Sequence, residues 1–415
     1  MAKQGYTSYD VSETDRSSTE IKRNGNADKR LQVWLVFLVV AILGIGAYFL
    51  IPSPAIQDTV RPLFNLAALG AFVAGIFMHR PRRPLPWYLF TLGMLLFVLG
   101  IAAYVYYEVT PPDGIPFPSL ADAFLIASYP CAAAALLLFQ RRRLARDRAS
   151  IIDPIIVAVG AGVIAWVFLM GPTLQDQKLS WLQHLATIAY PLMDILLLAL
   201  VVRMLLVSGR RPFAYYPLVA GVVCTLAFDI SYTVTSLTDN YQTGNPVDAL
   251  EMLFLAFLGT AALHPSMVDL SDGIVLAPET KLTRRRLVLL AVASLTAPGV
   301  LALQWARGEA LNVPVIVGAS VILFLLVLIR MAGIMKTRER AFDRERILRQ
   351  TSAALVAAPD REGIYEVALD TTQELLSEES RTWACVATGS DAKVTVVAAT
   401  GNRAGEFLGD RVYLD

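Results

Sequence analysis

Residues 31–51 read LQVWLVFLVVAILGIGAYFLI, an apolar run without a single charged side chain. A helix needs about 20 apolar residues to cross the hydrocarbon core of a bilayer. The run is longer than the apolar core of a signal peptide and lacks a convincing small-residue cleavage site, so we expect it to stay in the protein as an anchor. It therefore predicts the first span of a membrane protein.

The same pattern recurs along the chain. Nine further apolar runs follow, at 62–78, 85–107, 119–140, 150–171, 183–206, 214–236, 247–264, 286–305 and 312–334. The 415 residues are 55% hydrophobic and 17% charged, against about 45–50% and about 25% in soluble domains. An ordinary soluble enzyme is excluded, and we predict an all-α polytopic membrane bundle of about ten transmembrane helices in a lipid bilayer. The net charge of +1 gives no global field to attract nucleic acid, so no nucleic-acid partner is expected.

Basic residues cluster in alternate connections between these runs. Cytoplasmic loops carry an excess of Lys and Arg. The clusters are Lys22, Arg23, Lys29 and Arg30; Arg80, Arg82 and Arg83; Arg141, Arg142, Arg143, Arg146 and Arg148; Arg210 and Arg211; Lys281, Arg284, Arg285 and Arg286; and Lys336, Arg338 and Arg340. Ten spans with both termini in the cytoplasm satisfy this pattern, whereas removing one span would invert it. We therefore predict a multi-pass protein of the inner (plasma) membrane.

The segments outside the spans differ in composition. Residues 1–30 are polar and predict a disordered cytoplasmic tail before the transmembrane domain at 31–334. Residues 335–357 are charged and free of Pro and Gly, which predicts a cytoplasmic linker helix continuous with the last span. Apolar residues recur every seven positions at Ile334, Ala341, Leu348 and Leu355, but their heptad companions are polar. This partial pattern favours a homodimer through the linker helix and leaves a solvated monomeric helix as the alternative.

Residues 358–415 read as part of an α+β domain. One helix with an apolar face is followed by strand-like runs at 382–387 and 393–399, a turn at 388–391 between them, and a third strand at 411–414. So small a segment buries too little surface to be independently stable. We therefore expect the chain to end inside this domain.

Ionisable side chains within the spans are candidate site residues, because each costs about 2.5–3.5 kcal/mol at the bilayer centre. The carboxylates and the tyrosines near them are Asp122, Tyr129, Tyr190, Asp194, Asp229, Asp248 and Glu251. Asp194 lies near the middle of its run, and the set as a whole leans towards the extracytoplasmic half, where it predicts an outward-facing polar cavity for a proton, a cation or another small polar ligand. In the alternative interpretation Asp122 and Asp248 only cap helices and Asp194 is a polar contact between helices.

No motif for chemistry accompanies these residues. The chain has no phosphate-binding loop, nucleophile elbow or zinc motif, and its three cysteines are scattered. His184 and His264 have no partner at ligand spacing. We therefore predict no catalytic residue, no metal site and no cofactor in this chain.

Short motifs in the membrane region carry a family resemblance. They are Pro118–Asp122, Tyr129-Pro130, Tyr190–Asp194, Arg210–Pro212, Ala227–Asp229, Asp248 and Ala261–Met267. The set resembles the multi-span sensory region of actinobacterial signalling proteins, in which a cytoplasmic GAF or PAS domain follows, and then commonly GGDEF and EAL domains that make and degrade cyclic di-GMP. Some relatives of this layout end in a histidine kinase. The segment from about residue 361 resembles the start of a GAF domain.

The resemblance implies a membrane sensor that relays a ligand or membrane signal to a GAF domain and an output domain. The whole protein would then be a diguanylate cyclase or phosphodiesterase, but no Gly-Gly-Asp-Glu-Phe signature is present, so no residue here takes a catalytic role. A secondary transporter with a regulatory domain is the second hypothesis, since broken helices and intramembrane carboxylates also suit alternating access. A membrane enzyme acting on lipids would need paired acidic motifs or His clusters in cytoplasmic loops, and none is present.

Overall fold

The computed structural model describes residues 33–109, 116–144, 151–175, 177–206, 211–237, 240–272, 284–308, 311–376, 384–390, 393–400 and 411–413. The chain divides into two compact units, one up to Val327 and one from Leu328. The tail predicted at residues 1–30 lies outside the described residues.

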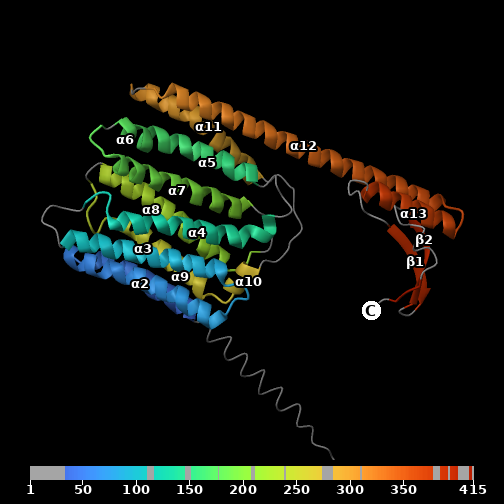
Figure 1. Cartoon of the computed structure of the whole chain (residues 1–415), viewed down its shortest axis with the longest axis horizontal. Helices are drawn as coiled ribbons and strands as arrows, with labels where there is room; N and C mark the ends of the chain where they lie inside the picture. Colours follow the sequence, from blue (N-terminus) through green and yellow to red (C-terminus); the bar gives the residue numbers. More distant parts are fainter. Residues whose placement is uncertain are drawn as a thin grey trace, which may run out of the picture. The chain divides into compact units, whose positions relative to one another are not determined.

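The first unit is helical, and its helices lie side by side with nearly parallel axes (Figure 1). They are Val33–Leu50, α2 (Pro54–His79), α3 (Leu85–Val109), α4 (Leu120–Leu144), α5 (Ile152–Ala165), a π-helical turn (Trp166–Met170), α6 (Gly171–Gln175), α7 (Trp181–Leu206), α8 (Tyr215–Leu237), α9 (Val247–Leu263), α10 (Met267–Asp272), α11 (Arg284–Arg307) and the first part of α12 (Val313–Ala357). Among the described residues, nine helices are long and apolar enough to cross a membrane, with Ile152–Gln175 forming one of them. The expected helical membrane bundle is confirmed at this level.

The eighth predicted span, at 247–264, is the short helix α9. It has 17 residues, of which 13 are buried. At 1.5 Å per residue it is about 26 Å long, near the lower limit for crossing a bilayer. Because α9 packs between α2 and α8, protein rather than lipid surrounds most of it. The apolar run at 247–264 therefore marks a central helix of the bundle.

Small residues let α9 approach its neighbours closely. A Cβ added at Gly75 of α2 would lie 2.1 Å from the carbonyl oxygen of Ala262, and one added at Gly221 of α8 would lie 2.7 Å from Leu258. Lipid tails are as apolar as large side chains, so burying such side chains between helices gives no net gain in a membrane. Small residues favour association instead, because they let the helix backbones pack closely.

The C-terminal end of α9 is fixed by a His-Pro-Ser turn. The Nε2 atom of His79 donates to the carbonyl oxygen of Leu263 at 2.8 Å. The backbone N–H of Ser266 donates to Nδ1 of His264 at 3.1 Å, and the Ser266 hydroxyl accepts from the N–H of Ala214 at 2.9 Å. Burial and the nearby His79 lower the pKa of His264, which keeps Nδ1 free to accept. The turn therefore ties the end of α9 to the start of α8.

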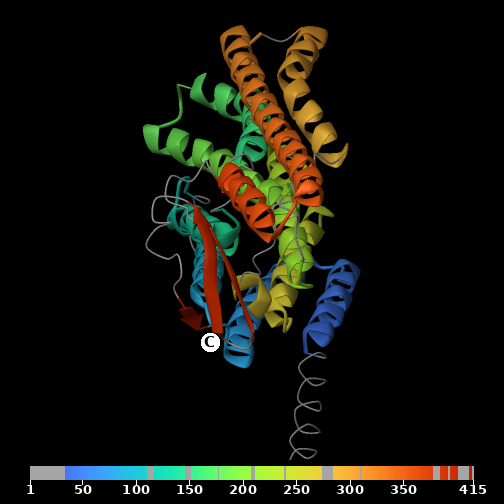
Figure 2. The same cartoon turned by 90° about the vertical axis from the view of Figure 1, so that its right-hand side faces the viewer.

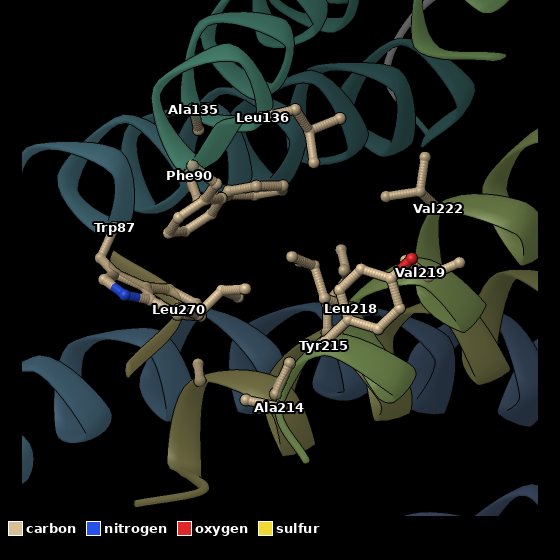
Figure 3. Packing of buried hydrophobic residues seen from close by; sticks show 14 of the residues in the cluster. Trp87, Phe90, Ala135, Leu136, Ala214, Tyr215, Leu218, Val219, Val222 and Leu270 are labelled. Atoms are coloured by element: carbon tan, nitrogen blue, oxygen red, sulfur yellow. The ribbon is translucent and has the colours of Figure 1, made fainter. Parts of the chain in front are cut away.

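Aromatic side chains fill the core near this end of the bundle (Figure 3). Trp87 meets Phe139 edge to face at 5.0 Å between ring centroids, and Phe72 stacks on Phe90 at 5.9 Å. Such aromatic pairs stabilise a fold by more than the apolar area they bury would predict. The cluster joins α2, α3 and α4 and continues to α7, α8 and α9.

A second apolar cluster joins α5, α11 and the start of α12. Its buried members include Ile156 of α5, Ala297 of α11 and Ile316 of α12. Figure 1 and Figure 2 both show α11 beside this part of α12. A buried ion pair, Arg286 Nε to Asp153 Oδ2 at 3.3 Å, fixes one end of the α5–α11 contact.

The second unit contains the rest of α12, then α13 (Arg361–Leu376) and three strands, β1 (Ala384–Ser390), β2 (Lys393–Thr400) and β3 (Arg411–Tyr413). The strands form an antiparallel sheet in the order β1-β2-β3, and α13 lies against β1 and β2. Leu369 and Val396 are buried in this unit. β1 continues to Ser390, so residues 388–390, expected in the turn, belong to the strand.

Replacing Gly75 by Val is expected to destabilise the bundle by about 1–3 kcal/mol, because the branched side chain would overpack the contact with Ala262. The measurement is the midpoint of thermal unfolding in detergent. The control is Gly70→Val on the same helix, where an added Cβ meets nothing within 4 Å. Equal midpoints for the two variants would contradict the close contact.

Candidate functional site

Polar side chains gather towards one end of the bundle. They come from the N-terminal halves of α2, α4 and α9, from the first half and the middle of α7, from the C-terminal half of α8, and from the end of the helix Val33–Leu50. Because consecutive helices run in opposite directions, these parts meet at the same end. All seven residues predicted for the site lie here, in two groups that are described in turn.

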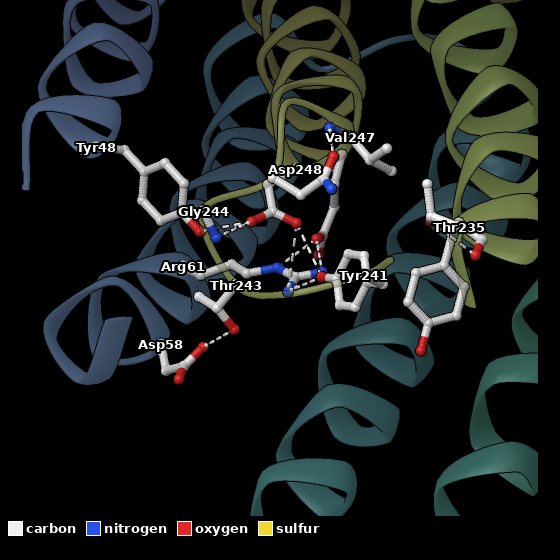
Figure 4. A network of polar contacts seen from close by, with 12 residues as sticks. Tyr48, Asp58, Arg61, Thr235, Tyr241, Thr243, Gly244, Val247 and Asp248 are labelled. Atoms are coloured by element: carbon white, nitrogen blue, oxygen red, sulfur yellow. Dashed lines mark hydrogen bonds and ion pairs between the residues drawn. The ribbon is translucent and has the colours of Figure 1, made fainter. Parts of the chain in front are cut away.

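The first group surrounds Arg61 of α2 (Figure 4). Its guanidinium forms an ion pair with Glu251, approaches Asp248 at 3.7 Å, and donates through Nη1 to the hydroxyl of Tyr241 at 2.8 Å. The side chains of Asp248 and Glu251 are 0% and 1% exposed. A charge so deeply buried is stable only when it is paired and hydrogen-bonded, and Arg61 supplies that pairing.

Asp248 is also held by neutral donors. Its Oδ2 accepts from the Tyr48 hydroxyl at 2.7 Å and from the N–H of Gly244 at 2.8 Å, and its Oδ1 accepts from the Tyr241 hydroxyl at 2.8 Å. Gly244 has φ +89°, a left-handed conformation that favours glycine and turns this N–H towards the carboxylate. Asp248 therefore joins three segments of the chain as well as starting α9.

Tyr241, in the segment between α8 and α9, stays a hydrogen-bond donor. Burial raises the pKa of its hydroxyl, the positive charge of Arg61 opposes this rise, and the negative charge of Asp248 adds to it. The net direction is upward, so the hydroxyl keeps its proton in the physiological range. It can then donate to Asp248 while it accepts from Arg61.

The second group lies on α4, α7 and α8. The Tyr190 hydroxyl donates to Asp122 Oδ1 at 2.8 Å, and the Tyr129 hydroxyl donates to Asp229 Oδ2 at 3.2 Å. Asp194 lies within hydrogen-bonding reach of both Asp229 and Tyr129. The rings of Tyr129 and Tyr190 meet edge to face at 6.4 Å.

Asp122 has two roles. Besides accepting from Tyr190, its Oδ2 accepts from the N–H and the hydroxyl of Ser119 at 2.7 and 3.0 Å. This is a capping arrangement at the start of α4, as in the alternative interpretation of the sequence.

The two groups are neighbours. Tyr232 of α8 packs against Tyr241 at 4.8 Å between ring centroids, and the charges of Asp229 and Glu251 are close enough to interact. The carboxylates and tyrosines predicted from the sequence thus form one polar network. Among the described residues no group of three or more His, Cys, Asp and Glu side chains is arranged to hold a metal ion.

Sequence reasoning missed four members of the network: Tyr48, Arg61, Asn65 and Tyr241. Asn65 is 1% exposed and its amide faces Glu251. Gln57, Arg61 and Asn65 are spaced by four residues and therefore share one face of α2. This polar stripe could have revealed Arg61 and Asn65, but the predicted span began at residue 62, which placed Arg61 outside the membrane.

Comparisons with known proteins identify no relative. No family model matches the chain, no curated protein is similar to it, and no solved structure matches it. The resemblance to signalling proteins therefore remains a hypothesis that rests on short motifs.

Replacing Arg61 by Met is expected to destabilise the protein by about 3–5 kcal/mol, because Asp248 and Glu251 would stay buried without their cation. The measurement is again the thermal midpoint in detergent. The control is the double variant Arg61→Met with Glu251→Met, which removes the ion pair and is expected to recover most of the loss. A single variant as stable as the double variant would contradict this role of Arg61.

Proposed function

We propose that this chain is the sensory and transmission part of a membrane signalling protein. In this proposal the polar network receives the signal and α12 carries it out of the membrane. The observation that carries the proposal is that α12 is one helix of 45 residues, which begins as an apolar span and continues through the charged segment to the unit with α13 and the sheet. A continuous helix can transmit a displacement along its length.

A contiguous set of helices is available for the relay. α7, which bears Asp194, packs on α5, and α5 packs on α11. A Cβ added at Gly160 of α5 would lie 2.9 Å from the carbonyl oxygen of Ala293, so these backbones are in close contact. Ile316 and Leu323 of α12 belong to the same apolar cluster. A displacement of α7 would therefore be passed through α5 and α11 to the start of α12.

The π-helical turn Trp166–Met170 is our candidate for the element with two arrangements. It interrupts the span formed by α5 and α6, and π turns are frequent at functional sites. A ligand shifts an equilibrium only through its different affinity for two states, so a relay requires such an element. The turn lies on the helix between the network and α12, which supports this assignment.

The receiving unit would be the start of a GAF domain. Its helix and antiparallel sheet suit the resemblance seen in the sequence, and the full protein would end in domains that make or degrade cyclic di-GMP, or in a histidine kinase. Phe342, Leu348 and Val356 of α12 are more than half exposed although they lie in the charged part of the helix. Their exposure supports a homodimer through this segment.

A sensor fits the position of the network better than a transporter does. Secondary transporters bind their substrates near the bilayer midplane, between paired broken helices. Here Asp194 lies near the middle of α7, but most of the polar residues lie towards one end of the bundle. In the topology that we propose, with both termini in the cytoplasm, this end faces the outside of the cell.

That topology requires α9 to cross the membrane, which can be tested by cysteine labelling. In a background without native cysteines, Asn240→Cys precedes α9 and Asp269→Cys follows it, and both positions are exposed. We expect a membrane-impermeant maleimide to label only Asn240→Cys in intact cells, and both after lysis. Labelling of both in intact cells would show that α9 does not cross.

The relay predicts that changes in the network alter the distance between the two α12 helices of a dimer. A spin label at Ser352→Cys, in the same background, reports this distance in nanodiscs. We expect Asp194→Asn and Asp229→Asn to change the distance distribution. The control is Asp269→Asn, an exposed carboxylate of α10, which should leave it unchanged. Identical distributions in all variants, or a monomer, would contradict the proposed relay.

A further inference from the structure

We propose that Asp194 and Asp229 form a proton-binding site inside the bundle, in which one exchangeable proton is shared between the two carboxyl groups. The inference rests on the proposed function in one respect only, that binding of this proton is the signal. The site itself is argued from the contacts of the network.

The two carboxyl groups lie too close together to carry two negative charges. They are within hydrogen-bonding reach of each other, on neighbouring helices α7 and α8. Two carboxylates that share a site of low polarity cannot both ionise, and the pair is stable when it holds one proton. The Tyr129 hydroxyl donates to Asp229 at 3.2 Å, and the Oδ1 atom of Asp194 is buried with no hydrogen-bond partner among the described residues.

The charge balance of the network leads to the same conclusion. It contains five carboxyl groups, Asp122, Asp194, Asp229, Asp248 and Glu251, and Arg61 is its one cation among the described residues. Arg61 compensates Asp248 and Glu251. Among the described residues the Asp194–Asp229 pair receives a hydrogen bond from a tyrosine and has no cation beside it, so a proton is the simplest positive charge that can balance it.

Unpartnered polar atoms next to the pair indicate how a proton reaches it. Neither amide atom of Asn65 has a hydrogen-bond partner within the described part of the chain, and neither has Oε1 of Glu251. Both side chains are 1% exposed, and the Asn65 amide faces Glu251, whose charge interacts with Asp229. Buried polar groups of this kind are completed by water, which can also conduct a proton.

A proton fits these residues better than a metal ion. A metal ion needs several oxygen ligands around one point. The described residues contain no such cluster, and the guanidinium of Arg61 lies against Glu251. Each carboxyl group of the network is instead matched to a hydroxyl, a guanidinium or another carboxyl group.

The groups that face the pair can be named for each helix packed around it. α4 contributes Tyr129 and Asp122, α7 contributes Tyr190, α8 contributes Tyr232, and α9 contributes Glu251. Tyr129 and Tyr190 act as hydroxyl donors in these contacts, so the charge that changes is that of the pair. Loss of the shared proton would introduce repulsion between α7 and α8, and α7 is the helix that packs on α5.

The test is infrared difference spectroscopy of the full chain in nanodiscs, titrated from acid to alkaline pH. We expect one carbonyl band of a protonated carboxylic acid that disappears as the pH rises. The band should be lost in both Asp194→Asn and Asp229→Asn, because each removes one half of the shared site. The control is Asp269→Asn, which should keep the band.

Tyr129→Phe provides a second variant in case the Asn variants fail to fold. It removes a hydrogen bond to the ionised pair, so the pH at which the band disappears should rise by about one unit. Asn65→Leu should slow the hydrogen–deuterium shift of the same band, since it removes both amide atoms from the route. A folded Tyr129→Phe variant with an unchanged titration would overturn the assignment.

Three other outcomes would also overturn the proposal. They are the absence of a titrating carboxyl band, its persistence in either Asn variant, and its loss at constant pH when sodium replaces choline, which would identify a cation as the ligand. The proposed function fails separately. If the band titrates as expected but the distance at Ser352→Cys does not change with pH, the proton site stands and the relay does not.

Discussion

The pairing of Arg61 with two buried carboxylates is the constraint on which this end of the bundle depends. A guanidinium in the apolar part of a helix must be neutralised and given acceptors for its donors. Glu251 and Asp248 provide the charges, and Tyr241 provides a further acceptor. Each of them has to be brought to α2 from about 180 to 190 residues further along the chain. The ion pair therefore determines where α9 starts and how the segment before it is folded.

α9 is consequently positioned from both of its ends. Asp248 and Glu251 fix its first turns to α2, and the turn from His264 to Ser266 fixes its last turn to α2 and α8. Between these ends, Gly75 and Gly221 allow close backbone contact. A helix held in this way is positioned by contacts with protein rather than with lipid. Its burial also brings Glu251 near Asp229, so the two polar groups become one network.

The spans could be predicted from the sequence because an apolar run of about 20 residues has one stable solution in a bilayer. The carboxylates could be identified because they interrupt these apolar runs, and a charge within such a run needs a partner. Which partner it takes depends on contacts between distant segments, as for Tyr190 with Asp122, and composition does not encode these. Arg61 was missed because an arginine next to an apolar run is indistinguishable from one that reaches the headgroups. The end of β1 was misplaced because Thr388 and Gly389 favour turns, whereas pairing with β2 extends the strand to Ser390.

The two polar groups differ in their charge balance. The group around Arg61 stabilises the fold, and we assign the response to a signal to the group around Asp194 and Asp229. Around Arg61 the charges are matched by a cation and by hydroxyl and backbone donors, so this group has one favourable arrangement and holds α2 and α9 together. Around Asp194 and Asp229 like charges meet on adjacent helices, and the favourable arrangement depends on whether a proton is present. The fixed group provides the frame against which α7 and α8 can move. In the relay that we propose, a network with both parts would change the position of α7, and through α5 the start of α12, without loss of the fold.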